Sequence, residues 1–253
     1  MIFIMSLANN KRSRFSLVEL LLVIGILMVL TSMINTQLHN ITNKAYTLVC
    51  ANNLKSIGSS MEFYMEDNNS YFPPASFSPK HTWLQYGTWD DLLGEGYDGR
   101  DLTYAEVEEP ARSEGYSLYE CPEQVQLYDN SKEPWKHLRS YSLNCNSLWG
   151  KWYNGISSRW GNVQFSKETD TPAPARTIAI AEFPDILGDG YATPGLEEGY
   201  AMQNLHLDQS HKTQFNYLFV DNHIEFLFPA ETYDPKGVWW GKYSRYWTRD
   251  PND

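Results

Sequence analysis

Residues 15–34 form an apolar run, FSLVELLLVIGILMVLTSMI, in which Glu19 is the only charged side chain. A helix of about twenty such residues is long enough to cross a hydrocarbon core of about 30 Å. The rival interpretation is a secretory signal peptide, which has a shorter apolar region and ends in an Ala-x-Ala-like site. Thr31-Ser32-Met33 matches such a site poorly. The run therefore predicts a transmembrane helix over residues 15–34.

The charges that flank this run predict its orientation. Residues 1–14 form a basic leader with Lys11, Arg12 and Arg14 and no acidic residue, and no comparable basic cluster follows Ile34. Basic residues stay on the cytoplasmic side of a membrane. We therefore expect a single pass through the inner (cytoplasmic) membrane, with the N-terminus in the cytoplasm and the head in the periplasm or at the cell surface.

The remainder of the chain is acidic and rich in core-forming residues. The formal net charge is −11, from 20 basic and 31 acidic residues, and 42% of the residues are hydrophobic. An acidic body repels phosphate backbones, so we expect no nucleic acid among the partners. The apolar content predicts a folded body, because it is large enough for a sizeable core.

Glu19 needs an explanation, because a carboxylate in an apolar membrane helix costs about 2.5 to 3.5 kcal/mol even on the lenient insertion scale. One interpretation is structural: Glu19 lies four residues past Phe15 and reaches the headgroups or the Arg14 region at the cytoplasmic interface. The other is functional, since acids inside membrane segments are usually retained for a role.

Residues 35–70 are expected to form an amphipathic stalk helix that continues the membrane helix. The first proline after the run is Pro73, and turn formers follow Asp67. One helix from Phe15 to Asp67 would be roughly 80 Å long. Apolar residues recur at the helical spacings of three and four along this segment: Leu38, Ile41, Ala45, Leu48, Val49, Leu54, Ile57, Met61, Tyr64 and Met65.

Residues 71–253 are expected to form an α+β head with an antiparallel sheet. A C-terminal hairpin is predicted over residues 213–228, because its two halves are rich in β-branched and aromatic side chains. Asp221-Asn222 would form a two-residue turn with positive φ values, which pairs Phe219 with Ile224. Turn chemistry alone therefore accounts for Asp221.

The segment 14–24, RFSLVELLLVI, resembles the N-terminal processing and methylation segment of type IV prepilins and type II secretion pseudopilins. In that family a membrane peptidase cuts before the Phe and methylates the new N-terminus, and the Glu neutralises the terminal amine of a neighbouring subunit. The resemblance implies processing between Arg14 and Phe15, with Glu19 as the assembly carboxylate. The implied partners are a prepilin peptidase and other pilin-like subunits. Arg14 stands where the family usually has Gly.

Residues 50–58, CANNLKSIG, and 71–74, YFPP, sharpen this resemblance. They are similar to pilin-like proteins abundant in Planctomycetes and Lentisphaerae, whose C-terminal signature is a His, nine residues and then Asp-Gly. In this chain His211 precedes nine residues and then Asp221, and Asn222 stands in place of the Gly. The resemblance implies a pilin-like fold, with the long helix packed on the sheet.

Three cysteines, Cys50, Cys121 and Cys145, cannot all pair within one chain. A head outside the cytoplasm permits a disulfide, and Cys121 with Cys145 closes a plausible loop that leaves Cys50 on the helix. Reduced thiols and a pair that includes Cys50 are the alternatives. Motifs of serine hydrolases, P-loop proteins and zinc proteases do not occur, nor does a His at a spacing that would make a catalytic cysteine, so we expect no enzyme.

Two groups of residues carry metal-binding side chains without a recognised ligand spacing. The first is a candidate zinc group, for which solvated or hydrogen-bonded roles are favoured. The second is a candidate calcium group, considered because secretion pseudopilins use calcium in C-terminal loops. We predict no metal or other cofactor. The zinc group is His206, Asp208, His211, Asp221 and His223, and the calcium group is Asp185, Asp189, Glu197 and Glu198.

These observations favour a membrane-anchored, pilin-like structural subunit. The alternative is a surface protein that uses the leader only as an anchor and recognises a polysaccharide through a Trp-rich head. A weaker third hypothesis is a tethered metallohydrolase, which requires the zinc group to converge on one point. The glycan hypothesis requires exposed tryptophans on one face, drawn from Trp149, Trp152, Trp160, Trp239, Trp240 and Trp247.

Overall fold

The computed structural model describes residues 16–77, 87–107, 116–127, 140–146, 155–158, 166–182, 195–197, 214–232 and 246–247. The chain divides into two compact units, Met1–Thr42 and Asn43–Asp253. The boundary lies within one helix, α1 (Leu17–Asp67), which contributes to both units. The basic leader, and with it both predicted processing residues, Arg14 and Phe15, lies outside the described residues.

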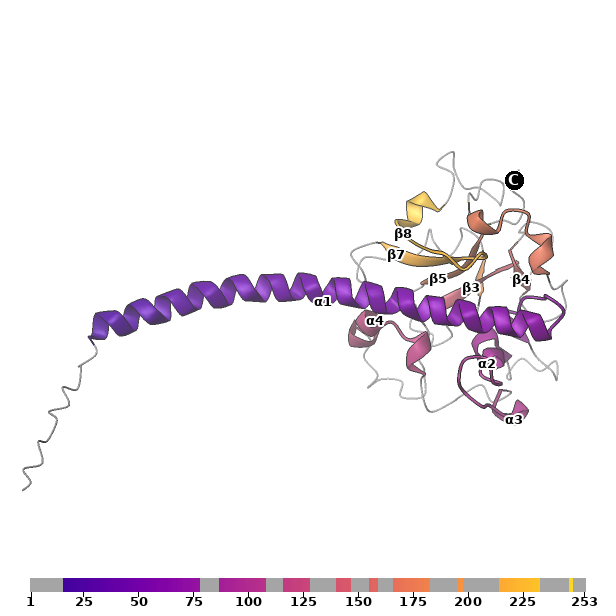
Figure 1. The fold of residues 1–253 in the computed structure, drawn as a ribbon, viewed down its shortest axis with the longest axis horizontal. Helices are drawn as coiled ribbons and strands as arrows, with labels where there is room; N and C mark the ends of the chain where they lie inside the picture. The colour runs from indigo at the N-terminus through magenta and orange to yellow at the C-terminus, as the bar shows by residue number, and fades with distance from the viewer. Residues whose placement is uncertain are drawn as a thin grey trace, which may run out of the picture. The chain divides into compact units, whose positions relative to one another are not determined.

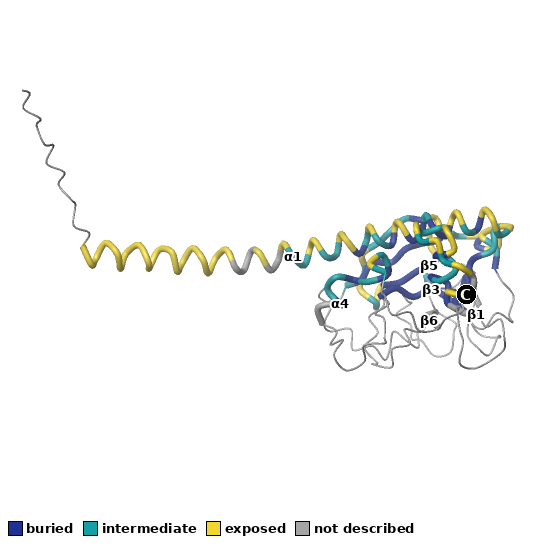
Figure 2. Tube along the Cα trace, turned by 90° about the horizontal axis from the view of Figure 1, so that it is seen from below, coloured by how far each residue is buried: buried dark blue, intermediate teal, exposed yellow. Residues whose placement is uncertain are grey.

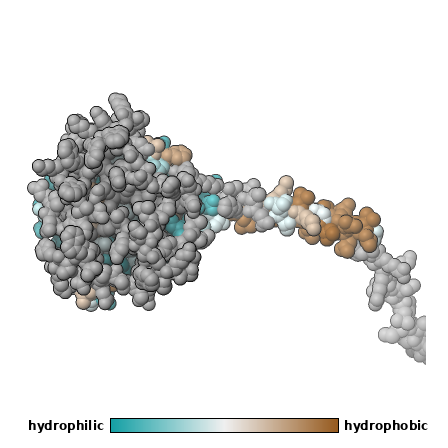
Figure 3. Space-filling view, turned by 180° about the vertical axis from the view of Figure 1, so that it is seen from behind, coloured by the Kyte–Doolittle hydropathy of each residue, from teal (hydrophilic) through white to brown (hydrophobic). Residues whose placement is uncertain are grey.

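The first unit contains the apolar part of α1. Leu17–Ile34 is long and apolar enough to cross a membrane, and none of it is buried within the chain. Figure 2 shows this part of α1 as exposed, and Figure 3 shows that its surface is hydrophobic. Thr31 and Ser32 donate their hydroxyls to backbone carbonyls one turn back, at Leu27 (2.9 Å) and Val29 (2.8 Å), so these polar groups need no water.

The N-terminus of α1 is capped by the side chains of Ser16 and Glu19. The Ser16 backbone N–H donates to Glu19 Oε2 (2.9 Å), and the Val18 N–H donates to Ser16 Oγ (3.3 Å). Ser16 therefore acts as the N-cap, and the two bonds satisfy donors at the start of the helix. Glu19 is therefore the acid of the first turn, where the helix dipole favours negative charge.

The second unit begins with the packed part of α1. Its buried side chains follow the helical period and are Cys50, Leu54, Ile57, Met61 and Met65. Apolar residues earlier in the helix, Leu38, Ile41 and Leu48, are exposed. α1 ends at Asp67, where Asn69 (φ 55°) and Ser70 (φ 63°) take the left-handed conformation that terminates a helix.

A sheet lies against this part of α1 (Figure 1). Four of its strands run antiparallel in the order β3-β5-β7-β8, which confirms the expected α+β class with an antiparallel sheet. Two short strands, β4 and β6, pair with β3 in parallel. The strands are β3 (Tyr141–Asn146), β4 (Ser157–Ser158), β5 (Ile178–Glu182), β6 (Gly195–Glu197), β7 (Phe215–Phe219) and β8 (Ile224–Leu227).

The sheet is covered on both faces. Leu143, Ile180 and Leu218 belong to the core that contains the buried stripe of α1. Side chains of β5 and β7 that point the other way form a second core with Trp247, and every residue of β5 and β7 is buried. Because both faces are covered, even the polar residues of these strands, Glu182 and Asn216, are buried.

Short elements complete the second unit. Thr88 precedes α2 (Trp89–Leu93), and its backbone N–H donates to the Asp91 carboxylate (3.1 Å). Trp89 packs edge-on against Tyr119 with ring centroids 5.5 Å apart. The Arg100 guanidinium lies over the Tyr119 ring and pairs with Asp98. These elements are β1 (Ser76–Phe77), β2 (Gly87–Thr88), α2 (Trp89–Leu93), α3 (Tyr104–Val107), α4 (Pro122–Leu127) and the 3-10 turns Ser117–Tyr119, Glu168–Asp170, Pro174–Arg176 and Pro229–Glu231.

The C-terminal hairpin is present, but its predicted register was wrong by one residue. Leu218 lies opposite Ile224, whereas a two-residue turn would place Phe219 there. A shift of one residue changes which side chains share a face. The observed pairs are Phe215–Leu227, Asn216–Phe226, Tyr217–Glu225 and Leu218–Ile224.

The turn of the hairpin explains this shift. The Asn222 N–H donates to the Phe219 carbonyl (2.9 Å), and the Phe219 N–H donates to the His223 carbonyl (2.9 Å). Asn222 has a φ of 64°, whereas Asp221 is not among the positive-φ residues. This is a three-residue loop with one left-handed residue and a bulge, not the expected two-residue turn.

Candidate functional site

The tip of the hairpin docks on α1, and the signature residue Asn222 makes the contacts. The Lys55 ammonium donates to the Asn222 carbonyl (2.6 Å), and the Asn222 side-chain amide donates to Glu62 Oε1 (3.0 Å). Lys55 and Glu62 lie almost two turns apart on α1, so they hold the tip from both sides. Neither residue was predicted as part of the signature, because nothing in the local sequence links residue 55 to residue 222.

Gly58 lies between these two anchors and gives the tip room. A Cβ at this position would lie 2.3 Å from Asn222 Oδ1 and 3.1 Å from Leu218 Cδ2. A Cβ here would therefore force the side chains of Asn222 and Leu218 to move. The close approach leaves Asn222 Oδ1 buried and without a hydrogen-bond partner.

The other two signature residues contribute no convergent site in the described structure. Asp221 is exposed, and its Oδ1 accepts the His223 backbone N–H (3.3 Å) and contacts the His223 ring nitrogen Nδ1. These are the local turn contacts expected of Asp at such a position. His211 lies outside the described residues.

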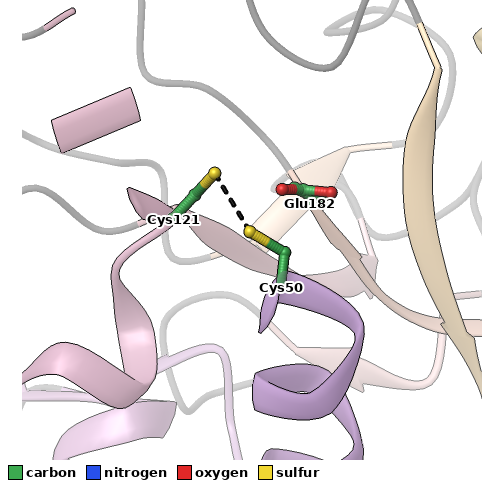
Figure 4. Close-up of side chains that lie close together, drawn as sticks. All are labelled: Cys50, Cys121 and Glu182. Atoms are coloured by element: carbon green, nitrogen blue, oxygen red, sulfur yellow. Dashed lines mark hydrogen bonds between the residues drawn. The ribbon is translucent and has the colours of Figure 1, made fainter. Parts of the chain in front are cut away.

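A second cluster lies in the core, where Cys50 of α1, Cys121 at the start of α4 and Glu182 of β5 converge (Figure 4). The Cys50 thiol donates to Cys121 Sγ at 3.1 Å. The ligand atoms of all three residues lie within 4.8 Å of one another, and all three side chains are buried. The predicted Cys121–Cys145 bond is not formed: all three cysteines are reduced, and the thiol in contact with Cys121 is that of Cys50.

The reason for this correction is tertiary. Cys145 lies on β3 in the same core, but it is α1 that brings a thiol to the Cys121 side chain. The backbone N–H of Cys121 donates to Ser140 Oγ (2.7 Å), which ties the segment before α4 to the start of β3. The number of residues between Cys121 and Cys145 carries no information about this packing.

The surroundings of the cluster favour the protonated form of the Cys50 thiol. The hydrogen bond with Cys121, burial and the negative charge of Glu182 together raise the pKa of Cys50. Burial also raises the pKa of Tyr141, whose hydroxyl accepts the Asn53 amide (3.4 Å). Glu182 Oε2 in turn accepts the backbone N–H (3.0 Å) and the side-chain amide (2.9 Å) of Asn216.

Glu182 was missed by the sequence reasoning, although a signal was present. It closes an otherwise apolar strand, TIAIAE, and a buried carboxylate needs donors. Only the fold shows that Asn216 supplies them and that Asn216 also donates to the Thr47 carbonyl of α1 (3.2 Å).

The candidate zinc group, for which no metal was predicted, is not assembled by the residues that the structure describes. His223 Nε2 lies 3.5 Å from Glu225, its neighbour on the hairpin. Within the described ranges, the grouping of metal-binding side chains that converges is the one formed by Cys50, Cys121 and Glu182. His206 and Asp208, like the calcium candidates Asp185, Asp189 and Glu198, lie outside the described residues, and Glu197 lies on β6.

Comparisons with protein-family models, curated proteins and solved structures find no match to this chain.

The tryptophans that the structure describes are core residues. Trp89 is fully buried, and Trp247, which is 1% exposed, donates its indole N–H to Thr232 Oγ1 (3.0 Å). Trp247 also packs edge-on against Tyr217. Trp247 therefore cannot serve as a sugar platform. The other glycan candidates, Trp149, Trp152, Trp160, Trp239 and Trp240, lie outside the described residues.

Proposed function

We propose that this protein is a membrane-anchored, pilin-like structural subunit that assembles with similar subunits outside the cytoplasmic membrane. The observation that carries the proposal is helix α1: one uninterrupted helix supplies both an unburied apolar segment and the central helix of a folded head. A cleavable signal peptide, or a helix that serves only as an N-terminal anchor, does not need to enter the core of the head. A subunit that assembles through its helix does need a helix that is packed firmly into its own head.

Exposed apolar side chains support helix-to-helix assembly. Beyond the membrane-spanning part, Leu38, Ile41 and Leu48 remain more than half exposed on α1, and Phe63 is 56% exposed. Exposed apolar side chains of this size, continuous with a membrane segment, favour packing against another helix. In the proposed assembly the partners are the α1 helices of neighbouring subunits.

Glu19 has two uses in this proposal. In the unprocessed chain its carboxylate accepts the Ser16 N–H and caps α1. Cleavage before Phe15 would create a new terminal amine on the residue next to Ser16. The Glu19 carboxylate would then pair with the terminal amine of a neighbouring subunit. Such pairing offsets the cost of a carboxylate in the membrane, which is about 2.5 to 3.5 kcal/mol.

Intact-mass and N-terminal analysis of the membrane-extracted protein tests processing. We expect a mature chain that begins at Phe15, with an N-methyl group, because the basic leader and the Phe-led apolar helix match the substrate of a prepilin peptidase. An intact Met1 in the mature membrane protein would contradict the proposed processing.

Glu19→Gln tests assembly. We expect the variant to insert into the membrane at least as well as the unaltered chain, since it carries no buried charge, but to be incorporated poorly into filaments or pseudopili. Glu66→Gln removes an exposed acid from the head-side part of the same helix and serves as the matched control, with unchanged incorporation. Normal incorporation of Glu19→Gln would instead favour the simple-anchor alternative.

A further inference from the structure

The Cys50–Cys121 pair joins two elements that are distant in sequence. The residues are 71 positions apart, and their sulfur atoms lie 3.1 Å apart with both side chains fully buried. A disulfide has an S–S distance of 2.03–2.05 Å, so the sulfurs need to approach by only about 1 Å.

We propose that Cys50 and Cys121 form a disulfide that fastens α1 to the head, while Cys145 remains a thiol. This inference rests on the proposed function in one respect, since a head outside the cytoplasm meets an oxidising environment. The bond would close a long loop between α1 and the segment before α4. It would join the helix that enters the membrane covalently to the sheet side of the core.

The reaction is a thiol–disulfide exchange with a dithiol–disulfide oxidant of the exported-protein compartment. The thiolate of one cysteine attacks a sulfur of the oxidant, and the oxidant releases one thiolate. The thiolate of the second cysteine then attacks the protein sulfur of this mixed disulfide and displaces the oxidant as a dithiol. The two cysteines lose two protons and two electrons, and the oxidant gains both.

We expect the disulfide to form during folding, before α1 has packed fully against the head. In the packed head the two thiols are inaccessible to an oxidant, and Glu182 and burial raise the pKa of Cys50, so its thiolate is scarce. Once formed, the bond is protected from reduction by the same burial. The disulfide would therefore be a stable structural bond and not a reversible redox switch.

Peptide mapping of the full-length chain tests the proposal. The protein is extracted from membranes in detergent, its thiols are capped with N-ethylmaleimide under denaturing conditions, and it is digested without reduction. We expect one linked species that contains Cys50 and Cys121, and a Cys145 peptide that carries maleimide. Maleimide on both Cys50 and Cys121 in this sample and in the refolded sample below, or a link from Cys121 to Cys145 in either, would overturn the proposal.

A second sample separates this inference from the proposed location. The full-length chain is reduced, unfolded in detergent and denaturant, and refolded in a buffer of reduced and oxidised glutathione. A Cys50–Cys121 link after refolding, with reduced thiols in the membrane extract, supports the pairing and contradicts the external location. A link in the membrane extract supports both, whether or not refolding reproduces it.

Variants and metal analysis complete the test. Cys50→Ala and Cys121→Ala should each abolish the link, and Cys145→Ala is the matched control that should retain it. Reduction of the unfolded chain, followed by refolding without an oxidant, should lower the melting temperature of the unaltered chain and of Cys145→Ala by about 10 °C, and leave that of Cys50→Ala unchanged. Stoichiometric zinc in the extracted chain, lost in Cys50→Ala, would overturn the proposal, because the thiolates would then be metal ligands.

Discussion

Asn222 shows how much one residue contributes to this fold. Its φ of 64° is a conformation that Gly, Asn and Asp adopt most readily, and its side chain and carbonyl both bind α1. A Gly at this position, as in the signature that the chain resembles, would supply the φ value but not the side-chain bond to Glu62. Asn therefore combines the turn with an attachment to α1.

Substitution of Asn222 tests this combination. Asn222→Val should destabilise the folded chain by about 2 to 3 kcal/mol, because a β-branched residue resists positive φ and the bond to Glu62 is lost. Asn222→Gly should change stability by less than about 1 kcal/mol, since the easier φ offsets the lost hydrogen bond. Urea unfolding followed by tryptophan fluorescence measures both. Equal losses for Val and Gly would show that backbone conformation is not the deciding factor.

At the scale of elements, the hairpin and α1 depend on each other through one close approach. Gly58 is less favourable than Ala within a helix by about 1 kcal/mol. It nevertheless allows Asn222 and Leu218 to pack closely against α1. A helix read in isolation would therefore favour Ala at this position. The packed structure requires Gly there.

A double-mutant cycle tests this dependence. Gly58→Ala should destabilise the chain by about 1 to 2 kcal/mol, because the added Cβ would collide with Asn222 Oδ1 and the overpacking outweighs the gain in helix propensity. In the Asn222→Gly background the same change should become neutral or stabilising. Ser56→Ala, on an exposed position of α1, is the control for propensity alone. An unchanged cost of Gly58→Ala in both backgrounds would contradict direct contact between the two positions.

At the scale of the whole molecule, the two units differ in what they bury. The head encloses a sheet with a core on each face, whereas the side chains of Leu17–Ile34 contact no core within the chain. Exposure of this many apolar residues to water is unfavourable, and the segment is long and apolar enough to cross a membrane.

Membrane partitioning tests that conclusion. The full-length chain should stay in the pellet after alkaline carbonate washing of membranes, whereas a chain that lacks residues 1–34 should stay in the supernatant. A chain that lacks only residues 1–14 retains the apolar run and should still sediment with membranes, which makes it the matched control. Sedimentation of the shorter head with membranes would show that the head itself carries a membrane-binding surface.

Features that depend on neighbouring residues were readable from the sequence. The apolar run, the end of α1 at Asp67 and the positions of the hairpin strands each follow from composition, periodicity or turn formers within a few residues. The left-handed conformation of residue 222 also follows locally, because Asn tolerates it. Local energetics acts on the same residues that carry the pattern, so these features need no knowledge of the fold.

Features that depend on distant residues came from the tertiary packing. Phe219 missed its predicted partner because the loop holds three residues, and the tip of this loop is held by contacts with α1. The meeting of Cys50 with Cys121, and of both with Glu182, requires α1, the segment before α4 and β5 to pack together. Contacts between residues so distant in the sequence carry no local signature, because their free energy is gained only when the sheet and helix close around one core.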